Sequence, residues 1–535
     1  MAEAVWWKTA VVYELLVPSF QDSNGDGWGD LPGITRRLDY LQDLGVGALW
    51  LSPINASPWY DIGYDVSDFT AVHPRFGTLE DFDQLVAEAH RRQLRIIIDF
   101  VPNHTSVEHP WFEQARQSRT NPKRLWYLWS DPGVGGGPPN NWINRFGETA
   151  WTLDGASGQY YFGSFTPQQP DLNWRNPEVR GAIAEAMHFW LRRGVDGLRI
   201  DALAHLIKDE RLRNNPRNLD YTEDLEPNNQ LCPVYHQNQP ELLDRIEEAR
   251  ALFDQYEDRV ILGEVYQSAE QITAYQRAGA HLLLSTAMLQ SEFETTQQRN
   301  VIDLAEGRTA VGAWPARSSG NHDIPRLASR VGQENLRLAA LLHFTVRGTP
   351  TMYYGEELGL CDMQVPPDRL QDPAGKADPR YGRDGYRAPM PWDDSPGAGF
   401  SNSTPWLPLD AATCKLHVAG QLRNSQSLLN FYRRVLRLRV REAALQTGDY
   451  APLETPEPIL AFVRGTGTDQ LLVAANLCNQ AHRLDLQAIG YACEGNQCIF
   501  STFSERPPSL TAVVTLRPRE AIIIRLQESQ HERSA

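Results

Sequence analysis

Short apolar segments alternate with segments of helical periodicity through most of the chain. Each short segment is apolar on both faces, which is typical of buried parallel strands covered by helices. The segments between them, such as residues 79–92, 177–193 and 240–256, repeat their apolar positions every three to four residues, as helices do. The eight predicted strands span residues 11–17, 47–52, 94–101, 197–201, 260–265, 281–286, 316–321 and 349–354.

Eight strand–helix units predict an α/β protein built on a (β/α)8 TIM barrel rather than on an open sheet. The alternative is a doubly wound nucleotide-binding sheet, which needs a Gly-rich phosphate turn after its first strand. The sequence after residue 17 contains no such turn. The closed barrel is therefore the favoured architecture.

Two parts of the chain do not follow this repeat. About 70 residues rich in Trp, Gly, Pro and Asn separate the third strand from the next helix, and so long a connection is usually functional. After residue 440, short alternating strands predict an antiparallel β-sandwich; these strands span residues 459–463, 470–476, 512–516 and 521–526. The expected organisation is a barrel over residues 1–104 and 175–440, an inserted domain over 105–174 and a C-terminal sandwich over 441–535.

The composition excludes several classes of protein. Of the 535 residues, 41% are hydrophobic and 22% are charged, which is normal for a folded globular chain. The net charge of −16 argues against nucleic-acid binding, because a phosphate backbone requires clustered Lys and Arg. The N-terminus lacks the pattern of a secretory signal, and no apolar run is long enough to span a bilayer. We therefore expect a cytoplasmic protein without a membrane partner.

Six cysteines are scattered along the chain without the CxxC pairs of a zinc site. They indicate reduced structural thiols, although a local disulfide between Cys493 and Cys498 remains an open alternative.

Four of the predicted strands end in acidic residues. A carboxylate at the end of a buried strand loses hydration unless it is paired or used in chemistry. Because the reactive groups of barrel enzymes lie at the C-terminal ends of the strands, these four acids are expected at one mouth. They are Asp99, Asp201, Glu264 and Asp323.

The neighbours of these acids suggest different roles. Arg199 and Asp201 lie on the same face of one strand, so Arg199 is expected to keep Asp201 ionised, as a nucleophile requires. Glu264 has no basic neighbour in its own strand. Burial of a carboxyl without a cation favours the protonated form, which suits a general acid. Two carboxyls in different environments, with Asp323 as a third, fit the cleavage of a glycosidic bond.

Residues 22–30 read DSNGDGWGD, with oxygen-bearing residues at the spacing of half a Ca²⁺-binding loop. The side chains of Asp22, Asn24, Asp26 and Asp30 and the carbonyl of Trp28 are the candidate ligands. The loop lacks the twelfth-position Glu of an EF-hand, and the alternative is a series of Asx turns satisfied by the backbone. We expect one structural Ca²⁺ (or Mg²⁺) here, and no organic cofactor.

Five motifs in order along the chain resemble the α-amylase superfamily of glycoside hydrolases (family 13), in its α-glucosidase/oligo-1,6-glucosidase branch. The resemblance runs from about residue 12 to residue 393, and the predicted sandwich also fits. Each motif is weak alone, but their order at barrel-strand spacing is specific. They are DFVPNHTS (99–106), QPDLNW (169–174), GLRIDALAH (197–205), GEV (263–265) and NHD (321–323).

The resemblance implies roles for individual residues. It makes Asp201 the nucleophile, Glu264 the acid/base and Asp323 the group that stabilises the transition state. It also pairs Asp61 with Arg387 around the non-reducing end of the sugar, which would restrict the enzyme to terminal glucose. The remaining implied substrate contacts are the stacking platform Tyr64, the polar contacts His104, Arg199 and His322, and Phe165 on the leaving-group side. In the same family, the loop at residues 22–30 often binds Ca²⁺ or Mg²⁺.

The implied activity is that of an exo-acting, retaining α-glucosidase, which acts through a covalent glucosyl-Asp intermediate. Its implied substrates are small α-glucosides of the maltose type, with sucrose as a further one, and sugars or alcohols are the acceptors in transfer. The first alternative is a transglucosylase or a sucrose isomerase, although residues 324–332 (IPRLASRVG) depart from the Arg-rich loop of the isomerases. A more remote alternative is an inactive, transporter-associated relative. After the nucleophile stands Ala202, where α-1,6 enzymes tend to have Val and α-1,4 enzymes Thr; we favour α-1,4 linkages with some breadth. The sequence leaves the oligomeric state open.

Overall fold

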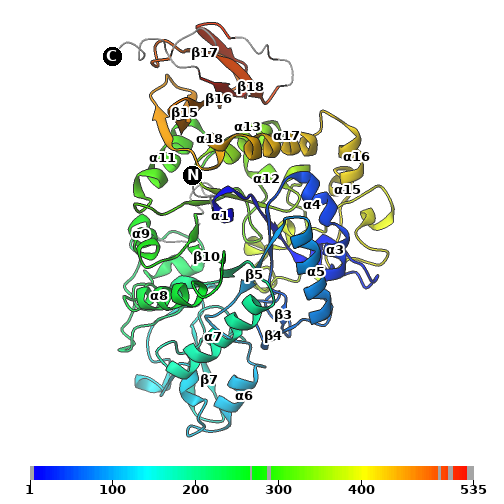
Figure 1. Cartoon of the computed structure of the whole chain (residues 1–535). Coiled ribbons are helices and arrows are strands. Elements are labelled where there is room, and N and C mark those ends of the chain that lie inside the picture. Colours follow the sequence, from blue (N-terminus) through cyan, green and yellow to red (C-terminus); the bar gives the residue numbers. More distant parts are fainter. Residues whose placement is uncertain are drawn as a thin grey trace.

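A closed barrel of eight parallel strands forms the centre of the computed structural model (Figure 1), which describes residues 5–223, 225–265, 268–285, 291–491, 496–503, 506 and 510–526. All eight predicted segments contain a barrel strand, which confirms the (β/α)8 fold; residue 286 of the sixth segment lies outside the described residues. The strands are β1 (Val12–Leu15), β2 (Ala48–Leu51), β5 (Arg95–Phe100), β9 (Gly197–Ile200), β10 (Val260–Val265), β11 (Leu282–Ser285), β12 (Ala316–Ser318) and β13 (Thr349–Tyr353). β1 closes the barrel by pairing with both β2 and β13.

Alternate residues of the barrel strands belong to two separate apolar clusters. One cluster includes Val12, Ile97 and Leu262 and fills the barrel interior, whereas Leu198 and Ile261 pack outward against the helices. This alternation follows from the strand period of two. Polar residues two positions further along the inner face must therefore emerge at the C-terminal mouth.

The covering helices present their apolar faces to the outer cluster. α5 (Leu79–Arg91) begins with a capping box at Thr78 and Asp81 and buries Phe82. α7 (Pro177–Arg192) buries Trp190, whose ring packs edge-on against Phe82 at 4.9 Å. Around the barrel, α8 (Leu242–Phe253), α9 (Ala269–Arg277), α11 (Thr295–Arg308) and α13 (Leu336–Thr345) continue this layer (Figure 1).

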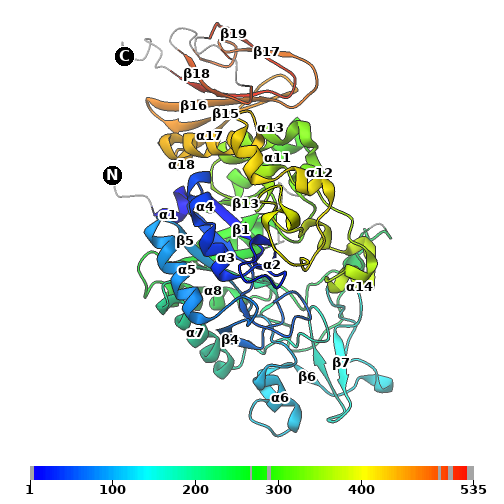
Figure 2. The same ribbon diagram turned by 90° about the vertical axis from the view of Figure 1, so that its right-hand side faces the viewer.

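The long connection between β5 and α7 contains α6 (Pro110–Gln117) and a small antiparallel sheet. Its strand order is β6 (Trp129–Ser130), β8 (Gln159–Phe162), β7 (Trp151–Asp154). Trp142, Trp151 and Phe162 form a separate apolar core beneath these strands. The segment lies at the end of the molecule opposite the C-terminal strands (Figure 2). A β-bridge between His104 and Asp171 joins its two ends beside the barrel mouth.

α17 (Leu428–Arg441) packs on α13 and leads into the C-terminal strands. Five of these strands form an antiparallel sheet in the order β14 (Tyr450–Leu453), β15 (Ile459–Thr466), β16 (Asp469–Asn476), β20 (Ala521–Arg525), β18 (Gln497–Ser501). β17 (His482–Asp485) and β19 (Val513–Leu516) pair separately, and both groups contribute to one apolar core. The predicted β-rich C-terminal region is confirmed.

Within the described ranges, no helix is both long and apolar enough to cross a membrane. The open question of a Cys493–Cys498 disulfide involves Cys493, which lies outside the described residues.

Candidate active site

Three of the four strand-end acids surround one buried arginine. Arg199 is 1% exposed, and its Nη1 lies 2.7 Å from Asp99 Oδ1 and 2.7 Å from Asp201 Oδ1. Its Nη2 lies 2.6 Å from Glu264 Oε1. Strand register explains this convergence, because Arg199 of β9 is level with Asp99 of β5 and with Leu262 of β10, two residues before Glu264 on the same face.

The sequence expectation for Glu264 was wrong on one point: this carboxyl does have a cation. Arg199 stands on the neighbouring strand rather than on the strand of Glu264. Neighbours along one strand could not reveal this contact, because cross-strand register is set by barrel closure. Glu264 also approaches the backbone N–H of Ala202, with 3.4 Å between Oε2 and N.

The expectation for Asp201 was half right. The ion pair with Arg199 is present, but burial raises the pKa of Asp201 well above its usual range, and the charges of Glu264 and Asp99 add to this effect. Burial likewise raises the pKa of Asp99 to about 6 despite the guanidinium. Three carboxyls that share one cation cannot all ionise cheaply, so the cluster favours a state that retains a proton. A protonated acid beside an ionised carboxylate is the combination that glycosidic cleavage requires.

Asp323 lies in the opposite electrostatic environment. Its Oδ1 is 2.7 Å from Arg383 Nη1 and 3.1 Å from Arg387 Nη2, and its Oδ2 is 3.3 Å from His322 Nε2. Burial opposes ionisation of Asp323, but His322 and the two arginines outweigh it and lower the pKa of this carboxyl below its usual value. Asp323 therefore remains an anion at neutral pH.

The predicted pairing of Asp61 with Arg387 was wrong, and Arg383 takes that place. Asp61 Oδ1 lies 3.2 Å from Arg383 Nη2, and its Oδ2 accepts a hydrogen bond of 3.1 Å from Gln169 Nε2. Arg387 instead donates to the carbonyl of His322 at 3.0 Å and contacts Asp323. Both arginines belong to the segment GRDGYRAP, four residues apart, and only the path of the turn at Asp384–Tyr386 decides which one faces Asp61.

Aromatic and imidazole rings line the space beside these charges. The Tyr64 hydroxyl donates to Asp99 Oδ2 at 3.0 Å, and its ring stacks on His322 at 5.5 Å with an interplanar angle of 18°. His104 is 1% exposed, and its Nε2 lies 3.0 Å from the Tyr64 carbonyl oxygen. Phe165 is partly exposed and packs 5.1 Å from the His104 ring. All the sequence-predicted substrate residues thus gather at the mouth.

The sequence interpretation gave no role to three groups at the mouth. Glu14 is a single acid within the apolar segment of β1 and contacts His322. Gln169 bridges Asp61 and His104, with its Nε2 3.1 Å from His104 Nε2. Lys208 pairs with Asp171 and donates to Asn103 Oδ1 at 2.9 Å, which fastens the inserted segment to the loop after β9. Two of the three had a signal in the sequence: Glu14 is a lone charge inside an apolar segment, and Gln169 begins the motif QPDLNW.

The predicted metal loop is folded as consecutive Asx turns. Asp22 accepts hydrogen bonds from the backbone N–H of Asn24, Gly25 and Gly27 and from the Ser401 hydroxyl. These four donors occupy the lone pairs of both carboxylate oxygens.

The later residues of the loop follow the same pattern. Asn24 accepts from the backbone N–H of Asp26, and Asp26 accepts from that of Trp28. Asp30 caps the short helix Leu31–Arg36 through Gly33 N. Across the described residues, no three His, Cys, Asp or Glu side chains form a group that could hold a metal ion. The loop therefore has the form of the alternative, a series of Asx turns satisfied by the backbone. The Ca²⁺ (or Mg²⁺) site at residues 22–30 remains a prediction.

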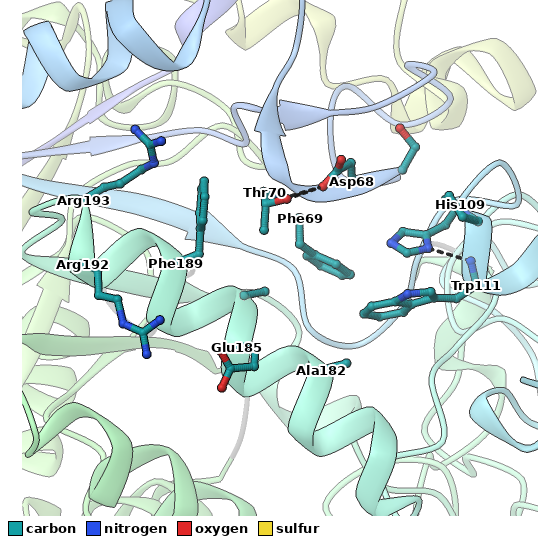
Figure 3. Close-up of a pocket in the computed structure, with 13 residues that line it drawn as sticks. Asp68, Phe69, Thr70, His109, Trp111, Ala182, Glu185, Phe189, Arg192 and Arg193 are labelled. Atoms are coloured by element: carbon teal, nitrogen blue, oxygen red, sulfur yellow. Dashed lines mark hydrogen bonds between the residues drawn. The ribbon is translucent and has the colours of Figure 1, made fainter.

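A cavity of about 640 Å³ lies outside the barrel mouth (Figure 3). It is lined by β4 (Asp68–Val72), by the N-terminus of α6 and by one face of α7, including Trp111 and Phe189. It shares no residue with the carboxyl cluster, so the cavity and the candidate active site are different places.

The fold and the site together define a glycoside hydrolase of the (β/α)8 class, because acids of opposite ionisation tendency converge at the C-terminal mouth of the barrel. The family model described as "Alpha amylase, catalytic domain" matches residues 14–448. The chain belongs to this α-amylase family.

Individual relatives agree with this family assignment. The chain is 40% identical to a probable alpha-glucosidase of Rhizobium meliloti (strain 1021), over 90% of this chain and 91% of that protein. It is 34% identical to an oligo-1,6-glucosidase of Heyndrickxia coagulans, over 90% and 93% respectively. A solved structure of the alpha-glucosyl transfer enzyme XgtA superposes with a TM-score of 0.91 at 37% identity, over 98% of this chain and 99% of that one.

The contacts of Arg383 predict that its forked side chain cannot be replaced by lysine. Arg383 contacts three carboxylates, those of Asp61, Asp323 and Asp372. An ammonium group cannot reproduce such a planar fork. We expect R383K to lower kcat/KM for p-nitrophenyl α-glucoside at least about tenfold, measured by initial rates.

R380K is the matched control, because Arg380 is exposed and its charged partner is the nearby Asp378. This control should stay within about twofold of the wild type, since surface pairs contribute little. Wild-type kcat/KM in R383K would show that the three-carboxylate contact is dispensable.

Proposed function

We propose that this protein is an exo-acting, retaining α-glucosidase that releases terminal glucose from small α-glucosides through a covalent glucosyl–Asp201 intermediate. The observation that carries the proposal is the contact of Asp201 and Glu264 with two nitrogens of the same guanidinium, that of Arg199. This contact holds the two carboxyls side by side. Retaining enzymes need such closeness, about 5–5.5 Å, whereas inverting enzymes leave room for a water between the acids.

In the proposed first step, Glu264 gives its proton to the glycosidic oxygen as Asp201 attacks the anomeric carbon. The carbon–oxygen bond to the leaving group breaks, and an ester between glucose and Asp201 forms. Glu264, now ionised, then removes a proton from water, which attacks the anomeric carbon and releases Asp201. The ionised Asp323 supports the proposal, because a fixed negative charge stabilises the positive charge that develops on the sugar ring.

The exo-acting character is supported by the contacts around Asp61. Its carboxylate lies between Arg383 and Gln169, and all three side chains converge beside the catalytic acids. Such a group can hydrogen-bond the terminal hydroxyls of a sugar, as an enzyme that takes single terminal glucose units requires. One glucose unit therefore fits this proposal better than an internal segment of a long polysaccharide.

Transglucosylation is the second candidate function, and the likeness to an alpha-glucosyl transfer enzyme favours it. The first chemical step would be the same, with a sugar or alcohol in place of water in the second. The three acids Asp201, Glu264 and Asp323 argue against an inactive relative. A cytoplasmic location remains a prediction from the sequence, testable by cell fractionation.

The linkage preference is proposed from Ala202. This residue follows the nucleophile with a left-handed φ of 49°, and its side chain is a single methyl group. Because a small residue leaves space beside the scissile bond, we expect α-1,4 substrates to be preferred with some α-1,6 activity.

The test is a product time course on maltose, isomaltose and sucrose, followed by NMR. We expect α-glucose as the first anomer released and faster turnover of maltose than of isomaltose. Release of β-glucose would contradict the retaining mechanism, and a strong isomaltose preference would contradict the linkage proposal. If oligosaccharides or sucrose isomers were the main early products, the main activity would be glucosyl transfer and not hydrolysis.

The two catalytic acids should be distinguishable by leaving group. We expect E264Q to lower kcat/KM for maltose by about 10²–10⁴-fold, because the sugar leaving group needs the proton that Glu264 supplies. The loss should be much smaller on α-glucosyl fluoride, whose leaving group needs little proton donation. D201N should lose activity on both substrates.

D378N serves as a surface control for these variants and should resemble the wild type, because Asp378 is a partly exposed surface residue that pairs with Arg380. Equal losses of kcat/KM in E264Q on maltose and on α-glucosyl fluoride would contradict the acid role of Glu264.

We also propose, from the ligand chemistry of residues 22–30, that the loop can hold one structural Ca²⁺ or Mg²⁺. Oxygen atoms of Asp and Asn and a backbone carbonyl are the ligands that both ions prefer. At 100 times its dissociation constant, a cation would add about 2.7 kcal/mol to the free energy of unfolding. We expect Ca²⁺ to raise Tm in the wild type after EDTA treatment, and not in D26N. Equal Tm with Ca²⁺, Mg²⁺ and EDTA would mean that the Asx turns hold the loop without a metal.

A further inference from the structure

A buried glutamate beneath the barrel mouth has no role in the mechanism described above. Glu14 points from the inner face of β1 and is 1% exposed. Its Oε1 lies 2.5 Å from Nδ1 of His322 and 3.4 Å from the backbone N of the same residue. Its Oε2 is buried and has no hydrogen-bond partner among the described residues. An ionised carboxylate with one bare oxygen is costly in such a place, whereas a neutral carboxyl is much less so.

The opposite nitrogen of His322 faces two acceptors. Nε2 lies 2.7 Å from the Tyr64 hydroxyl and 3.3 Å from Asp323 Oδ2. Tyr64 has a single O–H, which it donates to Asp99 Oδ2, a carboxylate in an ion pair with Arg199. The Tyr64 oxygen therefore presents a lone pair to His322. Asp323 is also an anion. Without a proton on Nε2, lone pairs of Nε2, the Tyr64 oxygen and Asp323 Oδ2 would face one another, so Nε2 must carry a proton.

The ring of His322 holds only that one proton. Burial lowers its pKa to about 3, since an imidazolium would lose its hydration. With the proton on Nε2, Nδ1 is a bare acceptor that faces Glu14 Oε1. Two bare acceptors at 2.5 Å would repel, so one proton must lie between them, and Glu14 is the group that can supply it.

The charges around Glu14 agree with a protonated carboxyl. Burial raises its pKa well above the usual range, and the negative charges of Asp99 and Asp323 act in the same direction. Arg199 opposes this effect, but its guanidinium already contacts Asp99, Asp201 and Glu264. The hydroxyl of Tyr353 on neighbouring β13 is also buried, and burial raises its pKa, so it keeps its proton and adds no charge near Glu14.

We propose that Glu14 is a neutral carboxylic acid that donates its proton to Nδ1 of His322 and so fixes His322 as an Nε2–H donor at the active-site mouth. Glu14 is then a positioning residue that acts through His322 and not on the substrate. The fixed Nε2–H supports the anionic Asp323 and bonds to the Tyr64 hydroxyl oxygen. This inference deepens the proposed glucosidase mechanism, and its catalytic consequence rests on that mechanism. The tautomer of His322 does not depend on it.

The first test reads the tautomer in the resting enzyme, without substrate. Protein labelled with ¹⁵N in histidine is measured by long-range ¹H–¹⁵N NMR, and the His322 signals are assigned by their loss in H322Q. We expect a neutral Nε2–H ring in the wild type, unchanged between pH 6 and pH 8. An Nδ1–H ring or an imidazolium would overturn the proposal, even if the enzyme proved to be an active glucosidase.

The second test compares substitutions of Glu14. In E14Q the amide N–H can still donate to Nδ1, so the Nε2–H tautomer should persist, with kcat within about threefold of the wild type. E14M keeps the length of the side chain but lacks a donor. We expect part of its His322 to become the Nδ1–H tautomer and kcat to fall about 10–100-fold, as for other groups that orient a functional histidine.

E357Q is the matched control, because Glu357 is also fully buried but bonds to Tyr13 and Tyr40 rather than to His322. It should leave the His322 signals unchanged. A loss of kcat in E14Q as large as in E14M, with the Nε2–H tautomer intact in both, would assign Glu14 a packing role only. If E14M does not fold, the wild-type and E14Q spectra still decide the proposal.

Discussion

The site depends on the burial of Arg199. A guanidinium keeps its charge in the protein interior and offers several donors in one plane, so it can pair with Asp99, Asp201 and Glu264 at once. The dependence is mutual. A buried arginine without these acids would lose its hydration and gain no ion pair in exchange, and the same holds for the acids without the arginine. The rings of Trp50 and Tyr64 lie 5.2 Å and 5.9 Å from the guanidinium carbon and exclude water from the cluster. Strand register around the barrel makes this arrangement possible.

A second arginine, Arg383, divides the acids of the mouth into two groups. It pairs with Asp61, Asp323 and Asp372, and burial of its charge among three carboxylates lowers the pKa of Asp372 to about 2 despite desolvation. Around Arg199 the balance is reversed, and burial raises the pKa of both Asp99 and Asp201. Asp323 and Asp372 thus stay ionised on one side of the mouth, while Asp99 and Asp201 on the other side can hold a proton. His322 stands between the two groups, with Glu14 beneath it and Asp323 beside it.

Much of the fold could be predicted, for reasons that differ between its parts. The eight barrel strands are buried on both faces, so their apolar segments stand out from the helices between them. In the C-terminal region, the sequence identified the central strands β15, β16 and β20, and β19 of the separate pair. It missed the edge strands β14 and β18 and also β17, the partner of β19. An edge strand carries a weaker apolar pattern, and β14 even contains Pro452, which is tolerated because one side of the strand is unpaired. The strands of the inserted segment were missed because β6 is only two residues long and the core depends on Trp142 from a loop.

The sequence by itself identified the acids at the ends of β5, β9 and β10, because side chains alternate along a strand and the inner face of a barrel leads directly to its mouth. Asp323 instead lies in the loop after β12. The sequence could not determine which charges meet at the mouth. Arg199 reaches Glu264 across strands, Arg383 rather than Arg387 faces Asp61, and Glu14 contacts a histidine that is 308 residues away. Barrel closure and the path of the loops set these contacts, and neither leaves a local pattern in the chain. Ionisation depends on the sum of such contacts and on burial, so the proton positions that the chemistry needs are a property of the tertiary structure alone.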